Sequence, residues 1–185
     1  TINVVRDNLP PVVTFQPPTK TNLNPVPLNG SVDDSLTTVT VNGITATRTQ
    51  RDFSVSVPLV SGSTPIHLVA MSPNGYSTVR DYSVTLGTIP TIQSMQPADG
   101  AKLYIGTAVP MQATATDQQG DPIQYQFSVD GTPLGDWAAA SSRAWTPAIT
   151  HLGLRQVTVS VRDAYGGVNT KDAEAYVVRS PVQHP

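Results

Sequence analysis

The sequence predicts an all-β chain of two tandem β-sandwiches with very little helix. The first observation is an internal repeat: Val39–Gly43 (VTVNG) corresponds to Phe127–Gly131 (FSVDG), about 90 residues later, and His67–Gly75 corresponds to Val157–Gly167 at nearly the same offset. That spacing is close to the length of one sandwich domain. The second observation is apolar/polar alternation of period two along many short segments. We therefore expect one domain in residues 1–88 and another in residues 89–185.

In the first domain the strand signals are short and end at turn residues. Phe53, Val55 and Val57 alternate with polar residues, as in a strand with one buried face. Asn42-Gly43 is a strong hairpin signal because both residues accept a positive φ. We expect strands at Val12–Gln16, Val26–Val32, Thr38–Asn42, Ile44–Arg48, Phe53–Leu59, Ile66–Ala70 and Ser77–Leu86.

The second domain follows the boundary segment Gly87–Pro90 and carries the same signals. Its clearest strand is Ile123–Val129, which ends at the Asp130-Gly131 turn, and Val157, Val159 and Val161 form another inward row. A helical turn is expected only at Asp136–Ala140 or Pro147–Leu152. The remaining expected strands are Thr91–Gln96, Lys102–Ile105, Val109–Thr116 and Asn169–Val178.

The composition excludes several classes of function. Charged residues make up 13% of the chain and the net charge is −2, so there is no basic field for a phosphate backbone, and we expect no nucleic-acid partner. Cysteine is absent, which excludes disulfides, a thiolate nucleophile and a cysteine zinc site. No apolar stretch is long enough to span a bilayer. The missing leader and initiator Met lead us to expect a segment of a longer exported polypeptide.

The first domain contains five segments of characteristic strand and turn sequence: Gly30–Val32, Val39–Gly43, Phe53–Leu59, Gly62–Ala70 and Asn74-Gly75. Through these segments it resembles bacterial immunoglobulin-like modules of secreted enzymes and surface proteins. The resemblance implies an immunoglobulin-like, fibronectin type III-like sandwich.

The second domain resembles polycystic-kidney-disease-type and cadherin-like bacterial domains through Asp117–Asp121, Tyr125–Gly131 and Leu152–Gly167. It departs from the former family at Arg155, where that family often has a tyrosine. Such modules are mostly spacers and adhesive or carbohydrate-facing accessories of large exported proteins, and the resemblance implies a role of that kind.

Three aspartates are candidate ligands of Ca²⁺. Asp117, Asp121 and Asp163 lie at the ends of strands that should be adjacent in a sandwich, and calcium takes six to eight oxygen ligands. The alternative is that these aspartates only form turns, as aspartate does in most hairpins, and Asp130 belongs to that class.

Two aromatic residues are candidate contacts for a carbohydrate or another partner. Trp137 and Tyr104 would form a stacking platform if they were exposed on one surface, because aromatic rings stack on the apolar faces of sugars. Trp145 is expected in the core, since its neighbours alternate as in a strand. Burial of Trp137 is the alternative for that residue.

Nothing in the sequence predicts an enzyme. His67, His151 and His184 have no partner at the spacing of a metal ligand or a catalytic triad, and Asp33-Asp34 reads as a turn pair. His67 points outward on its strand and is expected to be solvated.

The leading hypothesis is a non-catalytic structural spacer or protein-interaction module of a large exported bacterial protein, located outside the cell, on its surface or in the periplasm. Its partners would be other domains of the same polypeptide and a protein or polysaccharide ligand. The alternatives are a carbohydrate-binding accessory of a polysaccharide-degrading enzyme and a calcium-stiffened adhesin stalk.

Overall fold

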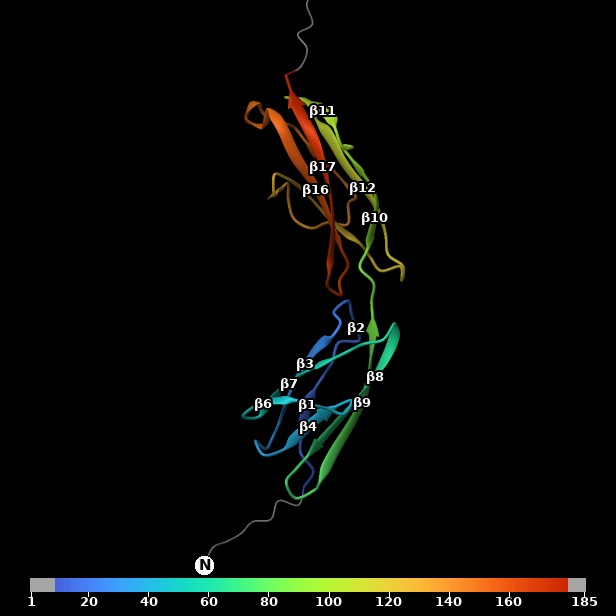
Figure 1. The fold of residues 1–185 in the computed structure, drawn as a ribbon, viewed down its shortest axis with the longest axis vertical. Coiled ribbons are helices and arrows are strands. Elements are labelled where there is room, and N and C mark those ends of the chain that lie inside the picture. Colours follow the sequence, from blue (N-terminus) through green and yellow to red (C-terminus); the bar gives the residue numbers. More distant parts are fainter. Residues whose placement is uncertain (1–8, 180–185) are drawn as a thin grey trace, which may run out of the picture. The chain divides into compact units, whose positions relative to one another are not determined.

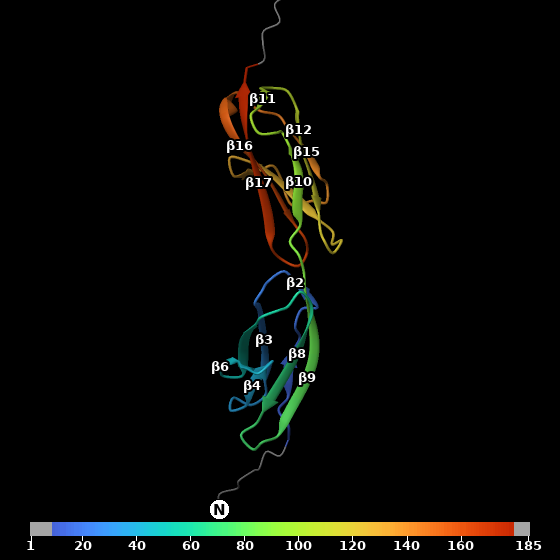
Figure 2. The ribbon, with the colours of Figure 1, turned by 45° about the vertical axis from the view of Figure 1, so that its right-hand side comes forward.

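The computed structural model describes residues 9–179. The chain divides into two compact units, Thr1–Gly87 and Thr88–Pro185, here called unit 1 and unit 2. The expected boundary between residues 88 and 89 lies next to this division. Each unit is built from two β-sheets (Figures 1 and 2).

Unit 1 contains a four-stranded sheet with the order β1-β3-β7-β6 and a five-stranded sheet with the order β2-β9-β8-β4-β5. Its strands are β1 (Val13–Phe15), β2 (Lys20–Thr21), β3 (Val26–Val32), β4 (Thr38–Val41), β5 (Ile44–Thr45), β6 (Thr47–Thr49), β7 (Asp52–Val57), β8 (Gly62–Met71) and β9 (Ser77–Leu86). The apolar/polar alternation in the sequence matches the alternation of buried and exposed residues in the structure. β7 buries every second residue, and so does most of β8.

One segment of unit 1 differs from the prediction. Ile44–Arg48 was expected to be a single returning strand, whereas the structure divides it into β5, which pairs with β4, and β6, which pairs with β7 in the other sheet. Ala46 is buried where the chain crosses between the sheets. Pairing with two different neighbours depends on contacts far away in sequence, which the alternation alone does not encode.

Unit 2 contains a three-stranded sheet with the order β10-β12-β15 and a five-stranded sheet with the order β11-β17-β16-β13-β14. Its elements are β10 (Thr91–Gln96), β11 (Ala101–Tyr104), β12 (Val109–Thr116), β13 (Gln124–Val129), β14 (Thr132–Pro133), β15 (Ser142–Trp145), a 3₁₀ turn (Ile149–His151), β16 (Gly153–Arg162) and β17 (Val168–Val178). The 3₁₀ turn lies inside Pro147–Leu152, one of the two segments where a helical turn was expected.

Both units have an apolar core between their sheets. In unit 2 the predicted inward row is confirmed, because Val157, Val159 and Val161 are fully buried, and Trp145 is also buried. In unit 1 Ile66, Leu68 and Ala70 are equally inaccessible. Removing these apolar side chains from water is the main favourable term in folding each unit.

The first strand of each unit is divided between the two sheets. In unit 1, β1 pairs antiparallel with β3, whereas β2 pairs parallel with the final strand β9. In unit 2, β10 pairs antiparallel with β12, and β11 pairs parallel with the final strand β17 (Figure 1). Each unit therefore has its first and last strands hydrogen-bonded side by side in parallel.

Within residues 9–179, no helix is long and apolar enough to cross a membrane.

Candidate metal centre

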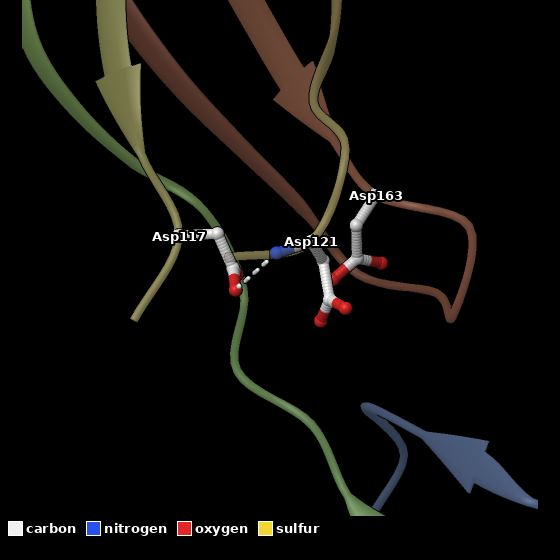
Figure 3. A group of neighbouring side chains, drawn as sticks. All are labelled: Asp117, Asp121 and Asp163. Carbon is white, nitrogen blue, oxygen red and sulfur yellow. Dashed lines mark hydrogen bonds between the residues drawn. The ribbon is translucent and has the colours of Figure 1, made fainter. Parts of the chain in front are cut away.

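Three aspartates meet at one end of unit 2. Asp117 directly follows β12, Asp121 lies in the loop that leads to β13, and Asp163 directly follows β16. Since β12 belongs to one sheet and β13 and β16 to the other, the loops bring together carboxylates from both layers of the sandwich. Figure 3 shows the three side chains at the ends of these strands.

The three carboxylates are close enough to share a cation. Each offers one oxygen, and these oxygens all lie within 4.8 Å of one another. Asp163 is buried, with 4% of its surface exposed, and the other two are half-buried. Three negative charges at this separation repel one another, and a divalent cation would offset both the repulsion and the cost of burial.

The same aspartates also organise their loops. Oδ1 of Asp117 accepts hydrogen bonds from the backbone N–H groups of Gln119 (2.8 Å) and Asp121 (3.1 Å), the second of which is drawn in Figure 3. Oδ1 of Asp163 accepts the N–H of Tyr165 at 2.8 Å. The turn role expected as the alternative is therefore present. It is compatible with metal binding, because a carboxylate has further lone pairs.

Thr88 is a further participant that the sequence analysis did not identify. Its hydroxyl donates to Oδ2 of Asp117 at 3.3 Å. Thr88 belongs to the boundary segment predicted from Gly87–Pro90, and no local pattern relates it to an aspartate 29 residues later. The three carboxylates supply oxygen atoms of the type that Ca²⁺ uses, and backbone carbonyls and water would have to complete its six to eight ligands.

Arg162 covers one face of the Trp137 ring. The guanidinium carbon of Arg162 lies 4.3 Å from the centroid of the Trp137 ring, and Nε of Arg162 donates to Oε1 of Gln124 at 3.1 Å. A cation in this position covers one face of the ring. Tyr104, the other predicted contact residue, pairs with the far end of β17.

Tyr104 and Trp137 do not share a platform. Tyr104 pairs with Val178 at the end of β17, whereas Arg162, on which Trp137 stacks, pairs with Val168 at its beginning. Ten residues of β17 separate these positions, which corresponds to about 33 Å along a strand. The expected common surface is therefore not formed, because the two residues lie at opposite ends of the sheet. A ligand would have to contact them separately.

The described histidines and the Asp33-Asp34 pair occupy local structural positions. His67 is exposed on β8, as predicted, and its Nδ1 lies 2.6 Å from Oδ1 of Asp81 on β9. Nδ1 of His151 accepts the N–H of Ala148, and the His151 ring packs edge-on against Trp145. Oδ1 of Asp34 accepts the N–H of Leu36, as in a turn, whereas Oδ1 of Asp33 accepts the N–H of Val12, 21 residues earlier in the chain. His184 lies outside the described residues.

Asp130 forms a charged contact that was not predicted. At the Asp130-Gly131 turn, Oδ1 of Asp130 accepts the N–H of Gln156 and Oδ2 accepts Nη1 of Arg155, each at 2.9 Å. The backbone hydrogen bond from Gln156 and, to a lesser degree, Arg155 hold the pKa of Asp130 below its ordinary value of 3.8, although burial opposes them. Arg155 also donates to the carbonyls of His151 and Leu152. The carboxylate therefore ties this hairpin to the 3₁₀ turn.

Comparison with known proteins identifies the fold. Neither a protein-family model nor a curated protein matches the sequence. The fibronectin(III)-like modules of CbhA from Clostridium thermocellum are similar in structure, with a TM-score of 0.60 and 17% identity over 94% of this chain and 98% of that chain. The titin I-band fragment I67-I69 aligns with a TM-score of 0.42 and 12% identity over 91% of this chain and 66% of that one. The chain is thus an all-β protein of two tandem immunoglobulin-like, fibronectin type III-like sandwiches.

Proposed function

We propose that this chain is a non-catalytic structural spacer of a larger exported bacterial protein, in which each unit resists extension along the polypeptide. The observation that carries the proposal is the parallel pairing of the first and last strands of each unit. When a unit is pulled by its ends, two parallel neighbours are displaced past each other, so the hydrogen bonds between them are loaded in shear and must break together. A hairpin pulled from its open end instead loses its bonds one by one.

The two units differ in the length of this parallel pair. In unit 1 it comprises Lys20 with Thr85 and Thr21 with Leu86, and in unit 2 it extends over four residue pairs, Ala101–Tyr104 with Ala175–Val178. In unit 1 the N–H groups of Thr85 and Gly87 donate to the carbonyls of Thr19 and Thr21, and in unit 2 the N–H of Ile105 donates to the carbonyl of Val178 at 3.1 Å. The longer pair is that of unit 2. Unit 2 is therefore expected to unfold at the higher force.

Single-molecule stretching of the whole chain between two handles tests the proposal. We expect two unfolding events, with unit 1 unfolding first. Ile105→Pro removes the Ile105 N–H donor and should lower the unfolding force of unit 2. Ile105→Ala is the matched control, because it shortens the side chain but keeps the N–H. Equal forces for the two variants would show that the parallel pair does not resist the pull.

A calcium-stiffened stalk is the second candidate, and the convergence of Asp117, Asp121 and Asp163 favours it. A cation that binds only the folded state raises stability by about 2.7 kcal/mol at 100 times its Kd. For a domain of this size that corresponds to a rise of about 10–20 °C in the melting temperature of unit 2 at a Ca²⁺ concentration 100 times the Kd. Chelator should reverse the rise.

The variants for this experiment come from the same unit. Asp163→Asn should abolish the calcium-dependent rise, whereas Asp130→Asn, which changes an aspartate outside the cluster, should retain it. A second signal comes from Trp137 in a Trp145→Phe background, because Trp137 stacks on Arg162, the neighbour of Asp163 in sequence. The calcium hypothesis is wrong if the wild-type melting temperature does not change, or if both variants respond equally.

The carbohydrate-binding alternative has no comparable support at its two named residues, since Trp137 is covered on one face and Tyr104 lies at the other end of the sheet.

A further inference from the structure

A surface depression lies in unit 1, over the four-stranded sheet. It has a volume of about 520 Å³ and spans all four strands, β1, β3, β7 and β6. None of the residues considered above as metal or carbohydrate contacts contributes to it. Four strands spaced as in any sheet give it a length of about 14 Å across the strands.

The strand register explains the shape of the depression. Directly paired residues share a face, so Thr14, Ser31 and Asp52 form one outward row. Asn29 and Ser54 lie two residues away from Ser31 and Asp52 along their strands and belong to a second outward row. The two rows lie about 7 Å apart, since successive residues on one face of a strand are separated by two residues.

The two outward rows are the walls of the depression, and the side chains of the row between them point into the core. Phe15, Gly30 and Phe53 are paired with one another, and the two phenylalanine rings lie 5.7 Å apart inside the sandwich. Gly30 is required there, because a Cβ at this position would clash with the Phe53 ring. The floor of the depression is therefore backbone, bordered on both sides by short polar side chains.

The chemistry of this surface selects a class of ligand. Its side chains offer hydroxyl and amide groups, which both donate and accept hydrogen bonds, and Asp52 is the one charged residue in the lining. A phosphate or another anion would be repelled by Asp52 and would meet no cation in the lining. A peptide strand would gain no main-chain pairing, because the backbone groups of the floor are already used within the sheet. An apolar ligand would leave the polar walls without partners.

We propose that unit 1 binds a neutral oligosaccharide chain in this depression, with its hydroxyl groups hydrogen-bonded to the two polar rows. A neutral polyol satisfies the walls without placing an anion next to Asp52. Since the surface is open and polar, the affinity should be modest, with a Kd of about 1 mM. This inference does not depend on the proposed spacer function, which concerns other strands and a mechanical property.

The test is a titration of the isotope-labelled whole chain, observed by two-dimensional NMR, with cellohexaose, mannohexaose and maltohexaose at about ten times the expected Kd. Trigalacturonic acid is the charged comparison. We expect at least one neutral hexasaccharide to shift the amide signals of Phe15, Gly30 and Phe53, and the acidic sugar to leave them unchanged.

Two matched variants locate the binding. Ser54→Arg places a long cation between the two walls and should weaken binding about tenfold or more, the loss of roughly one to two hydrogen bonds. Ser83→Arg introduces the same charge at an exposed position of β9 in the opposite sheet and should change the Kd less than about twofold. A thermal unfolding curve of each variant shows that it is folded.

Three results would overturn the proposal. They are the absence of shifts with all three neutral hexasaccharides, shifts confined to unit 2 around Trp137, and equal weakening by Ser54→Arg and Ser83→Arg.

Discussion

The two units close the same hairpin with different chemistry. Asn42 in unit 1 and Asp130 in unit 2 both precede a glycine and both have φ of 49°. Each donates its backbone N–H to a residue of the next long strand, His67 or Gln156, and accepts that residue's N–H on Oδ1. The backbone geometry of the turn is therefore repeated between the units.

The two turns differ in the contact made by the second polar atom of the side chain, Nδ2 of Asn42 or Oδ2 of Asp130. Nδ2 of Asn42 donates to the carbonyl of Pro65 at 2.9 Å, whereas Oδ2 of Asp130 accepts from Arg155. The asparagine turn is complete without a charge, but the aspartate turn needs a cation opposite it. Two turns with matching φ angles are thus expected to respond differently to pH and salt.

The core aromatic residues give a second contrast between the units, and the largest predicted effect. In unit 1 the ring centroid of Phe15 lies 5.7 Å from that of Phe53 and 5.3 Å from that of Tyr82. The core of unit 2 instead contains a tryptophan, Trp145, beside Tyr125 and Phe127. Trp145→Ala should destabilise unit 2 by about 3–5 kcal/mol, because it leaves a large cavity. Unit 1 should be unaffected.

Urea unfolding observed through resolved NMR signals of each unit measures this effect. Trp137→Ala is the control for removing an indole and should cost about 1–2 kcal/mol, because the half-buried Trp137 loses its contact with Arg162. If Trp145→Ala destabilised both units equally, their cores would not be independent.

An intermediate effect is expected at Gly30, which lies in the middle of β3. The Cβ of an alanine would lie 2.4 Å from Cζ of Phe53 and 2.7 Å from the Thr14 carbonyl oxygen. Gly30→Ala should therefore destabilise unit 1 by about 1–3 kcal/mol through overpacking. The double variant Gly30→Ala/Phe53→Leu should lose less stability than the sum of its single variants, as measured by a double-mutant cycle. Strict additivity would contradict the proposed clash.

The smallest effect is the pH dependence of the two turns. The pKa of Asp130 is lowered in the folded state, so its carboxylate stabilises unit 2 above the unfolded-state pKa, and this contribution is lost as the pH falls through the folded-state pKa. Asp130→Asn should cost about 0.5 kcal/mol at neutral pH, as for an exposed ion pair, and almost nothing in acid.

The carboxylate introduced by the reciprocal variant should contribute to stability with the opposite sign to that of Asp130. Asn42→Asp places a carboxylate against the Pro65 carbonyl, which raises its pKa, so unit 1 should be destabilised at neutral pH and recover as the pH falls through that raised value. Melting temperatures between about pH 3 and pH 7 measure both slopes. Relative to the wild type, both variants should therefore be less stable at neutral pH than in acid, and a cost of Asn42→Asp that stays constant or grows in acid would contradict the comparison.

Much of the fold follows from local sequence. The expected strands Val26–Val32, Val109–Thr116 and Ser77–Leu86 have their observed bounds. The rows Val157–Val161 and Ile66–Ala70 were predicted to be buried and are buried. Alternation succeeds because each strand has one face against the core, so the burial of a residue depends on its own side chain and its position in the strand.

The sequence alone also determined the turns at Asn42-Gly43 and Asp130-Gly131, because a positive φ is a local requirement. The tertiary structure decided which residues meet across the sheets: it brings Asp163 to Asp117 and Asp121, stacks Arg162 on Trp137, and separates Trp137 from Tyr104 along the length of β17. It also sends Thr45 and Thr47 into different sheets. These juxtapositions depend on the register between strands far apart in the chain, which is set by the packing of the whole sandwich.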